Sequence, residues 1–404
     1  MSRGPLSGLR VLDLTQVLAG PFATMLLADL GADVVKVEPR AGDMARAFGP
    51  FLTDDVEHFF GGYFASINRN KRSITLDLKH PAGVQALKRM VPQVDVLIEN
   101  FRGGVMEQLG CGYEELSSLN PKLVYACVRG YGDHRTGPSL CQDWPAFDLM
   151  AQAAGGLMGI TGDDAANPRK AGPGVGDLVP GMLVALGILA AARHAEMSGQ
   201  GQLVDVAMYD AVVALCERVV YQYSYQGSSP EPEGNNHPIL CPYGAFNALD
   251  GVVTIAAPTD AMWTKLVRLI DAPAAGRDPR FVTPAARQAH RSEVNSLIES
   301  WTSRLTKKEI VAALGREIPC AGVNTARDIF EDAHIAARQM VVPIDHPGSQ
   351  TGGSIAGLPI KFTETPGSIE RRAPLLGEHT EQILREFGFS SAEVRDLRTE
   401  ATVN

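Results

Sequence analysis

The aspartate at position 177 stands in a setting that suits covalent chemistry. Asp177 ends the glycine-rich segment GPGVGD, and Pro180 in the following apolar stretch is well suited to the first turn of a helix. Peptide dipoles at a helix N-terminus would keep this carboxylate ionised, and carboxylates can act as covalent nucleophiles. Capping of the helix is the simpler structural explanation. Three neighbouring glycines would leave room for a bulky ligand: Gly174, Gly176 and Gly181.

Basic side chains follow several of the predicted strands. They are Arg40, Lys71, Arg72, Lys79, Arg102 and Arg129. Solvated surface charge explains each one alone. Open α/β sheets, however, bind ligands beyond the carboxyl ends of their strands. Taken together, the set therefore predicts a site that could hold phosphate groups.

Other common catalytic motifs do not occur in the sequence. It contains no P-loop, HExxH, GxSxG or GxGxxG, so a nicotinamide cofactor has little support. The nine histidines form no HxH or HxxxH pair and the six cysteines form no CxxC, so no metal site is predicted. His237 lies in GNNHPILCPYGAF, which fits either a linker turn or a loop that covers a site.

The composition is typical of a soluble globular protein. The chain has 404 residues, 45% of them hydrophobic, and at about 150 residues per domain two domains are expected. The net charge of −9 argues against nucleic acid as a partner. The longest apolar stretch, Val179–Ala192, is too short to span a bilayer, and no signal peptide is predicted, so no membrane partner is expected. Unpaired cysteines favour a reducing, cytoplasmic location.

The order of the predicted elements indicates an open α/β sheet. A strand over Leu9–Leu14, a helix over Phe22–Leu30 and a strand over Ala32–Val37 form a β-α-β unit, which implies a parallel crossover. Four more strands are predicted in the same part of the chain: Ser73–Leu78, Val94–Ile98, Leu123–Arg129 and Gln202–Ala207. A long helix is predicted over Met208–Tyr223.

The composition changes after this helix. Gly227–Pro238 resembles a linker, Pro242–Ala256 predicts a hairpin, and helical patterns then dominate. We therefore predict an α/β protein with an open parallel-sheet, Rossmann-like large domain over residues 1–226. A smaller α+β domain is predicted over residues 227–342, followed by a C-terminal segment over residues 343–404.

Blocks along nearly the whole chain resemble the class III CoA-transferases. This family includes formyl-CoA transferase, carnitine CoA-transferase and the α-methylacyl-CoA racemases. The blocks are LRVLDLTQVLAGPFATMLLADLGADVVKVE, NRNKRSITLDLK, VLIENFRGGVMEQLG, NPKLVYACVRGYG, GVGD, GNNHPILCPYGAF and APLLGEHTEQIL.

The resemblance implies a specific activity and architecture. CoA would pass from an acyl-CoA donor, such as succinyl-CoA, to a carboxylic acid through an aspartyl-CoA thioester on Asp177. Coenzyme A would be a substrate, and no permanently bound cofactor is expected. The C-terminal segment would return to the large domain, and two chains would interlock as a homodimer.

The same resemblance implies a set of CoA contacts. These are Val17, Leu18, Ala19, Arg40, Leu76, Lys79, Asn100, Phe101, Arg102, Ala146, Phe147 and Asp148. Asn235 and His237 would offer hydrogen bonds to the distal carboxylate of a short dicarboxylic acid, such as succinate, malate, itaconate or glutarate.

Two alternatives remain at this point. An α-methylacyl-CoA racemase needs two bases, and members of that branch carry the motif GHD, with His as one base. Phe147 stands at the position of that His, and a phenyl ring accepts no proton. A non-catalytic CoA-binding module would need only the cations. Two departures from formyl-CoA transferases argue against formyl-CoA and oxalate as substrates: Leu18 replaces a glutamine, and GNNHPILCPYGAF replaces a glycine-rich lid.

Overall fold

The computed structural model describes residues 4–400 and 402–404, and the chain forms two compact units. The large unit comprises Met1–Leu157, Lys170–Ser229 and His334–Asn404. The small unit comprises Met158–Arg169 and Pro230–Ala333. The sequence-based boundaries placed residues 158–169 in the large domain and residues 334–342 in the small one. In the structure these segments belong to the small and the large unit, respectively.

The large unit is built on a six-stranded sheet whose neighbouring strands are all parallel. Its strands are β1 (Arg10–Asp13), β2 (Asp33–Glu38), β3 (Arg72–Thr75), β4 (Val96–Glu99), β5 (Val124–Arg129) and β6 (Leu203–Ala207). Their order is β3-β2-β1-β4-β5-β6, so the winding reverses between β1 and β4. The predicted open parallel sheet is confirmed. Ligands of such sheets bind beyond the carboxyl ends of the strands at this reversal.

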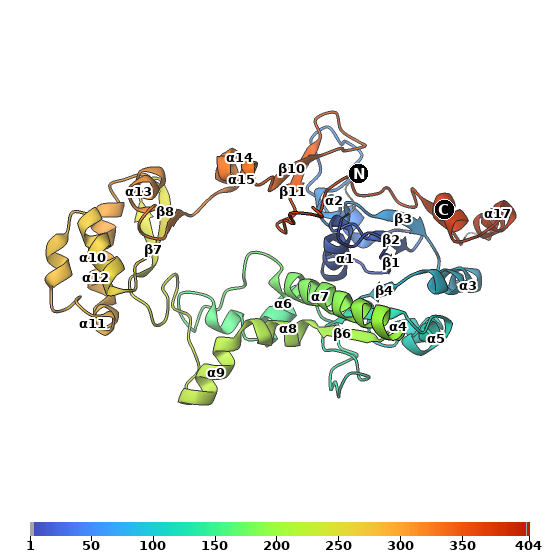
Figure 1. Cartoon of the computed structure of the whole chain (residues 1–404), viewed down its shortest axis with the longest axis horizontal. Coiled ribbons are helices and arrows are strands. Elements are labelled where there is room, and N and C mark those ends of the chain that lie inside the picture. The colour runs from blue at the N-terminus through green and yellow to red at the C-terminus, as the bar shows by residue number, and fades with distance from the viewer. Residues whose placement is uncertain (1–3, 401) are drawn as a thin grey trace. The chain divides into compact units, whose positions relative to one another are not determined.

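Helices lie on both faces of the sheet (Figure 1). In the large unit they are α1 (Ala19–Asp29), α2 (Gly62–Asn68), α3 (Pro81–Met90), α4 (Val105–Gln108), α5 (Tyr113–Leu119), α6 (Asp148–Ala154), α7 (Val175–Ser198), α8 (Met208–Leu215), α9 (Glu217–Gln226), α16 (Thr380–Glu386) and α17 (Ser391–Thr399). Short 3-10 turns form η1 (Met44–Ala47) and η2 (Val91–Gln93). On one face α1 packs against α7, and α7 packs against β5 and β6.

The main core lies on the opposite face. It joins Leu12 of β1 and Leu97 of β4 to Leu87 of α3, Leu116 of α5 and Ile383 of α16. Because the sheet is covered on both faces, β3, β4 and β5 are buried along their whole length, which explains the continuous apolar runs in the sequence there.

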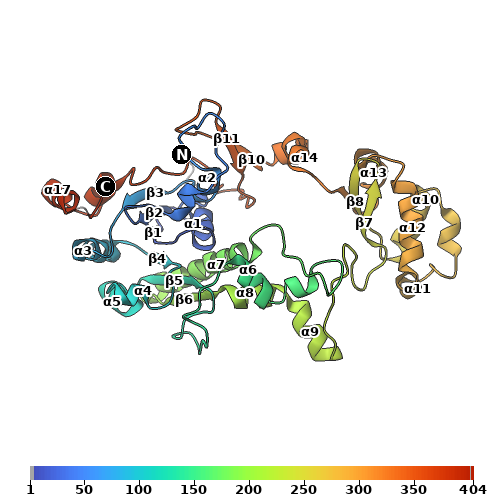
Figure 2. The ribbon, with the colours of Figure 1, turned by 180° about the vertical axis from the view of Figure 1, so that it is seen from behind.

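The C-terminal segment completes the large unit, and the chain ends beside β3 (Figure 2). The backbone N–H of His379 donates to the carbonyl of Ser73 at 2.9 Å, and that of Asn404 donates to Thr75 Oγ1 at 2.8 Å. Before these contacts the segment forms α15 (Ala333–Ala337), which begins on the last residue of the small unit, and then the antiparallel pair β10 (Val341–Ile344) and β11 (Gly353–Ala356).

The small unit combines a three-stranded antiparallel sheet with helices. Its strands are β7 (Tyr243–Ala248), β8 (Gly251–Ala256) and β9 (Cys320–Gly322). Its helices are η3 (Met158–Ile160), α10 (Asp260–Leu269), η4 (Pro273–Arg277), α11 (Pro284–Ala289), α12 (Arg291–Thr302), α13 (Lys307–Leu314) and α14 (Ala326–Glu331). The predicted hairpin is confirmed, because β7 and β8 pair around the turn at residues 249–250. Trp263, Phe246 and Ile298 lie in the core of this unit.

Two helices differ from the sequence prediction. α7 begins at Val175 and runs for 24 residues, and among the described helices it meets the length and composition of a membrane span. Core helices of soluble proteins meet the same criterion, and α7 packs on the sheet. The single helix predicted over Met208–Tyr223 is wrong: Cys216, whose side chain is buried, leaves helical geometry at ψ 42° and separates α8 from α9.

Candidate active site

A pocket of about 310 Å³ opens beyond the carboxyl ends of β1, β4, β5 and β6. It is lined by Gln16, Val17, Leu18, Ala19, Asn100, Phe101, Arg102, Gly103, Val128, Arg129, Gly130, Gln142, Trp144, Pro145, Ala146, Phe147, Asp177 and Met208. All of these belong to the large unit. The pocket therefore occupies the place where the winding of the sheet reverses, and it brings Asp177 together with eight of the residues predicted to contact CoA.

Asp177 is the third residue of α7, not its cap. Gly174 occupies the N-cap position, and no side chain caps the helix there. The neighbouring glycines have a packing role instead of the ligand space that was expected. A Cβ at Gly176 would lie 2.5 Å from the Asp148 carbonyl oxygen, and one at Gly181 would lie 2.6 Å from that of Ala19. The glycines therefore let α7 approach α6 and α1 closely.

The Asp177 carboxyl is partly buried near a second acid. Burial, and then the negative charge of Asp148, raise the pKa of Asp177 to about 7. Desolvation favours the neutral carboxyl, so Asp177 is only partly ionised near neutral pH, whereas the sequence predicted that the helix dipole keeps it ionised. Among the described residues, no basic side chain forms an ion pair with Asp177.

Asp148 is fixed by hydrogen bonds at the start of α6. Its Oδ1 accepts from the backbone N–H of Gly176 at 2.8 Å, and both carboxylate oxygens accept from Gln152 Nε2 at 2.9 Å. Asp148 was predicted to contact CoA, but it is not among the residues that line the pocket. Its carboxylate binds the first turn of α7 and raises the pKa of Asp177.

The loop after β4 forms a second wall of the pocket. The backbone N–H of Gln16 donates to Asn100 Oδ1 at 2.8 Å, and Asn100 Nδ2 donates to the carbonyl of Gln16 at 2.8 Å. These two hydrogen bonds join the loop to the turn after β1. The backbone N–H of Phe101 donates to Glu99 Oε2 at 2.7 Å. Arg102 is exposed, and its Nε donates to the carbonyl of Asp143 at 2.5 Å. Its guanidinium is therefore positioned by one backbone contact beside the pocket.

Besides Asp148, three residues of the predicted CoA set do not line this pocket. The Leu76 side chain is buried in the core of the sheet. Arg40 is exposed and donates through Nε to Asn404 Oδ1 at 3.0 Å, and Lys79 is also exposed. The resemblance located these residues correctly near strand ends, but β2 and β3, which they follow, lie on the other side of β1 from β4.

The basic residues predicted to hold phosphates divide into two groups. Lys71 is fully buried and lies 3.0 Å from Asp13 Oδ2. Arg72 pairs with Asp33 at 2.8 Å and with Glu386 at 2.7 Å, and Arg129 pairs with Glu99 at 2.5 Å. These three cations neutralise acids of the fold. The exposed cations Arg40, Lys79 and Arg102 remain as candidates for phosphate binding.

Aromatic side chains form the outer part of the pocket. Phe147 is 63% exposed and Trp144 is 61% exposed. Phe147 supplies no base beside Asp177. The sequence analysis missed Trp144, Gln142 and Met208, although Met208 directly follows a strand end, where lining residues are expected.

Asn235 and His237 belong to the small unit, whereas Asp177 belongs to the large unit. His237 Nδ1 accepts from the backbone N–H groups of Ile239 and Leu240, both at 3.1 Å. The imidazole stacks on Tyr243 with ring centroids 5.0 Å apart. Nδ1 is therefore an acceptor, and the side chain of Asn235 is exposed.

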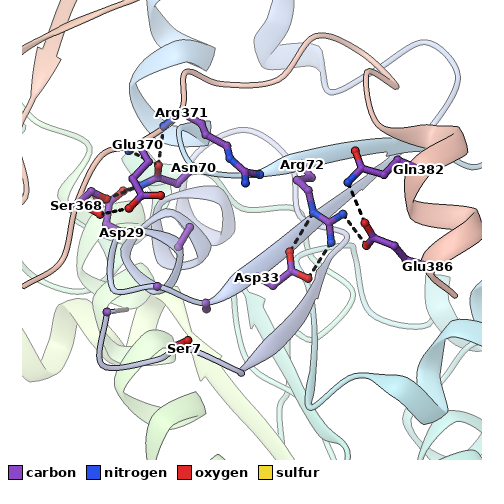
Figure 3. A pocket seen from close by; sticks show the side chains of 14 residues that line it. Ser7, Asp29, Asp33, Asn70, Arg72, Ser368, Glu370, Arg371, Gln382 and Glu386 are labelled. Carbon is purple, nitrogen blue, oxygen red and sulfur yellow. Dashed lines mark hydrogen bonds and ion pairs between the residues drawn. The ribbon is translucent and has the colours of Figure 1, made fainter. Parts of the chain in front are cut away.

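A larger pocket of about 790 Å³ lies at the opposite edge of the sheet. Figure 3 shows Arg72 held between Asp33 and Glu386, and Asn70 beside Asp29. These residues come from the end of α1, from the amino ends of β2 and β3 and from the C-terminal segment. Its charged groups are largely paired, and it contains none of the residues predicted for catalysis. We therefore assign the chemistry to the smaller pocket.

A metal site is not formed by the described residues, because no three histidine, cysteine, aspartate or glutamate side chains gather there. The six cysteines, all described, are unpaired.

Comparisons with known proteins identify the family. The model of CoA-transferase family III matches residues 6–380. The chain is 49% identical over 392 residues to succinyl-CoA:mesaconate CoA-transferase of Haloarcula hispanica, covering 97% of this chain and 98% of the relative. It is 38% identical over 389 residues to succinate–glutarate CoA-transferase of Agrobacterium fabrum, covering 95% and 96%.

A solved structure leads to the same conclusion. The CAIB/BAIF family protein from Brucella suis matches with a TM-score of 0.84 and 34% identity, over 95% of this chain and 100% of that one. These similarities favour the transferase prediction over the racemase and the non-catalytic alternatives. The chain belongs to CoA-transferase family III and is a class III CoA-transferase.

Proposed function

We propose that the protein transfers CoA from succinyl-CoA to a short dicarboxylic acid through a thioester on Asp177. The observation that carries this proposal is the position of Asp177, a carboxyl without a basic partner in the pocket at the reversal of the sheet. Mesaconate and glutarate, named for the two relatives, are the acceptors that we expect first.

The reaction would proceed in four balanced steps. The Asp177 carboxylate attacks the succinyl thioester, which gives a mixed anhydride and releases the CoA thiolate. The thiolate attacks the aspartyl carbonyl, which gives aspartyl-CoA and releases succinate. The acceptor carboxylate attacks this thioester, which gives a second mixed anhydride, between Asp177 and the acceptor, and again releases the thiolate. The thiolate then attacks the acceptor acyl carbonyl, which gives the new acyl-CoA and restores the Asp177 carboxylate.

The pKa of Asp177 suits this sequence. A carboxyl that titrates near pH 7 loses its proton at neutral pH and is still poorly solvated, which favours attack on a neutral thioester. Arg102 would bind a phosphate of CoA, since its exposed guanidinium lies beside the pocket and forms no ion pair with the described residues.

Residues of the small unit would recognise the acyl group. In this proposal His237 and Asn235 provide hydrogen bonds to the distal carboxylate of the dicarboxylic acid. His237 Nδ1 accepts hydrogen bonds from two backbone N–H groups. The neutral imidazole therefore carries its proton on Nε2, and this N–H can donate to a carboxylate.

We also propose a homodimer in the cytoplasm. The face of α7 turned away from the sheet exposes Met182, Leu186 and Met197, which are 47%, 64% and 75% exposed. A second copy of the chain would cover this apolar surface. Free cysteines agree with a reducing compartment.

The test is a trapping experiment with a panel of acceptors. Succinyl-CoA alone should leave CoA on the peptide that contains Asp177, and addition of mesaconate should release mesaconyl-CoA and the free enzyme. A covalent adduct on another residue, or transfer without any adduct, would contradict the aspartyl thioester. Acceptors that lack a second carboxylate provide the control for the dicarboxylate specificity.

A further inference from the structure

Val17 adopts a left-handed backbone conformation in the wall of the pocket. Its φ is +67°, which is a genuine outlier for a β-branched residue because the side chain crowds the backbone. Such conformations are strained and persist only where the surroundings determine them fully. Contacts around Val17 must therefore hold the turn after β1 in place.

A buried ion pair supplies two of these contacts. Lys36 Nζ lies 3.0 Å from Asp43 Oδ2, and both side chains are 0% exposed. The backbone N–H of Val17 donates to the two carboxylate oxygens of Asp43 at 3.2 and 3.3 Å. Lys36 Nζ also donates to the carbonyl of Thr15 at 2.8 Å. The pair thus holds the turn at Thr15 and at the strained residue Val17.

Neighbouring groups fix the ion pair in turn. The backbone N–H of Asp43 donates to Glu38 Oε2 at 3.0 Å, and Asp43 Oδ1 accepts from the N–H of Ala45 at 2.9 Å. Burial opposes the ammonium of Lys36, but the carboxylates of Asp13, Asp43 and Glu38 outweigh it and hold the pKa of Lys36 above its usual value. Lys36 is therefore charged at neutral pH.

The turn also packs on the segment that carries Asp177. A Cβ at Gly174 would lie 3.1 Å from Leu18 Cδ2, and a Cβ at Gly181 would lie 2.6 Å from the carbonyl oxygen of Ala19. A displacement of the turn would therefore move one wall of the pocket against the first turns of α7.

We propose that Lys36 and Asp43 are positioning residues for the CoA ester. Their ion pair holds the strained turn at Val17, so that Val17, Leu18 and Ala19 form a fixed wall of the pocket that contains Asp177. This inference rests on the proposed function of that pocket.

The experiment compares Asp43→Asn with a matched variant, Asp29→Asn. Asp29 pairs with Arg69 at 2.7 Å and is also buried, but it lies at the opposite edge of the sheet (Figure 3). Both variants leave a buried cation without its partner charge, so both should lose thermal stability. Only Asp43→Asn should weaken CoA binding in calorimetry, by about tenfold. The KM for succinyl-CoA should rise by a similar factor, while kcat changes by less than about threefold.

A second pair of variants isolates the strain. Glycine adopts the left-handed conformation without a Cβ penalty. In a Val17→Gly background, Asp43→Asn should therefore weaken CoA binding by less than about threefold. Equal losses in the two backgrounds, or equal effects of Asp29→Asn and Asp43→Asn on CoA binding, would overturn the inference.

The outcomes separate this inference from the proposed function. If Asp43→Asn does not fold, Val17→Gly alone should weaken CoA binding about two- to fivefold, since it leaves the turn less restricted; unchanged binding would overturn the inference. If the wild-type protein does not bind CoA, the proposed function itself fails. If Asp177→Asn abolishes transfer while Asp43→Asn behaves like Asp29→Asn, only the positioning role fails.

Discussion

The acids beneath the turn after β1 are buried and have basic partners, whereas Asp177 near the start of α7 is partly buried and has no basic partner among the described residues. Asp13 lies 3.0 Å from Lys71, and Asp43 lies 3.0 Å from Lys36. Asp177 instead lies near another carboxylate, that of Asp148, and its pKa rises to about 7. The paired acids stabilise the fold, whereas the acid without a basic partner is the one suited to react.

Removal of the unpaired acid should have the largest effect on activity. Asp177→Asn keeps the shape of the side chain and removes the nucleophile, so CoA transfer should fall by at least about 1,000-fold. The measurement is the rate of acceptor-CoA formation from succinyl-CoA. Activity near that of the wild type would contradict the assignment.

The same variant has a stability signature. Since the pKa of Asp177 is raised from 3.8 to about 7, the stability that its protonated form contributes is complete below about pH 4 and is lost as pH rises through 7. Asp177→Asn should therefore melt at a higher temperature than the wild type at pH 8, with a smaller difference at pH 5. Lower stability than the wild type at pH 8 would show that the carboxylate has a compensating partner.

Loss of the basic partner of an acid beneath the turn after β1 should chiefly reduce the stability of the fold. Lys71→Met leaves Asp13 as an unpaired buried charge, and such changes cost about 3–5 kcal/mol. Urea unfolding measures the loss. The control is Arg385→Ala, which breaks an exposed pair with Glu381 and should cost less than about 1 kcal/mol. Similar losses in the two variants would refute the contrast between buried and exposed pairs.

An exposed cation beside the pocket should act on binding alone. A charge-assisted contact to phosphate is worth about 1.5–3 kcal/mol, so Arg102→Ala should raise the KM for succinyl-CoA about 10- to 100-fold. The effect should shrink at high salt, and kcat should change little. Arg395→Ala, an exposed arginine on α17, is the matched control. An unchanged KM at low salt would redirect the phosphate site to Arg40 and Lys79.

The smallest expected effect sharpens the comparison at Asp148. In the wild type kcat/KM should rise with pH through about 7, because only the ionised Asp177 attacks. Asp148→Asn removes the neighbouring negative charge and should move this rise of kcat/KM to lower pH, by less than about one pH unit, since burial is the larger cause of the raised pKa. If the rise stays at the same pH, burial alone raises the pKa of Asp177.

Much of the fold was predictable because its signals are local. Continuous apolar runs marked the strands of the parallel sheet, and the turn residues Asp250 and Gly251 marked the hairpin of β7 and β8. Asp177 was identified from its place before an apolar helix and from the family resemblance, which also gave Asn100 and Arg102 in the ENFR block, and the structure places all three around one pocket.

Other features depend on packing between distant residues. The sequence could not reveal that Lys71 is buried against Asp13, since 58 positions separate them. The pKa of Asp177 follows from its burial and from Asp148, and the break at Cys216 follows from tertiary packing. The role of Gly176 and Gly181 in close helix packing likewise emerges only when α7 is seen against α6 and α1.

The return of the C-terminal segment determines when the large unit can be completed during synthesis. Its main core contains Ile383, Phe387, Leu397 and Val403. The small unit, whose residues end at Ala333, is fully synthesised before these residues. We therefore expect that the small unit can fold before the sheet acquires its last covering helices.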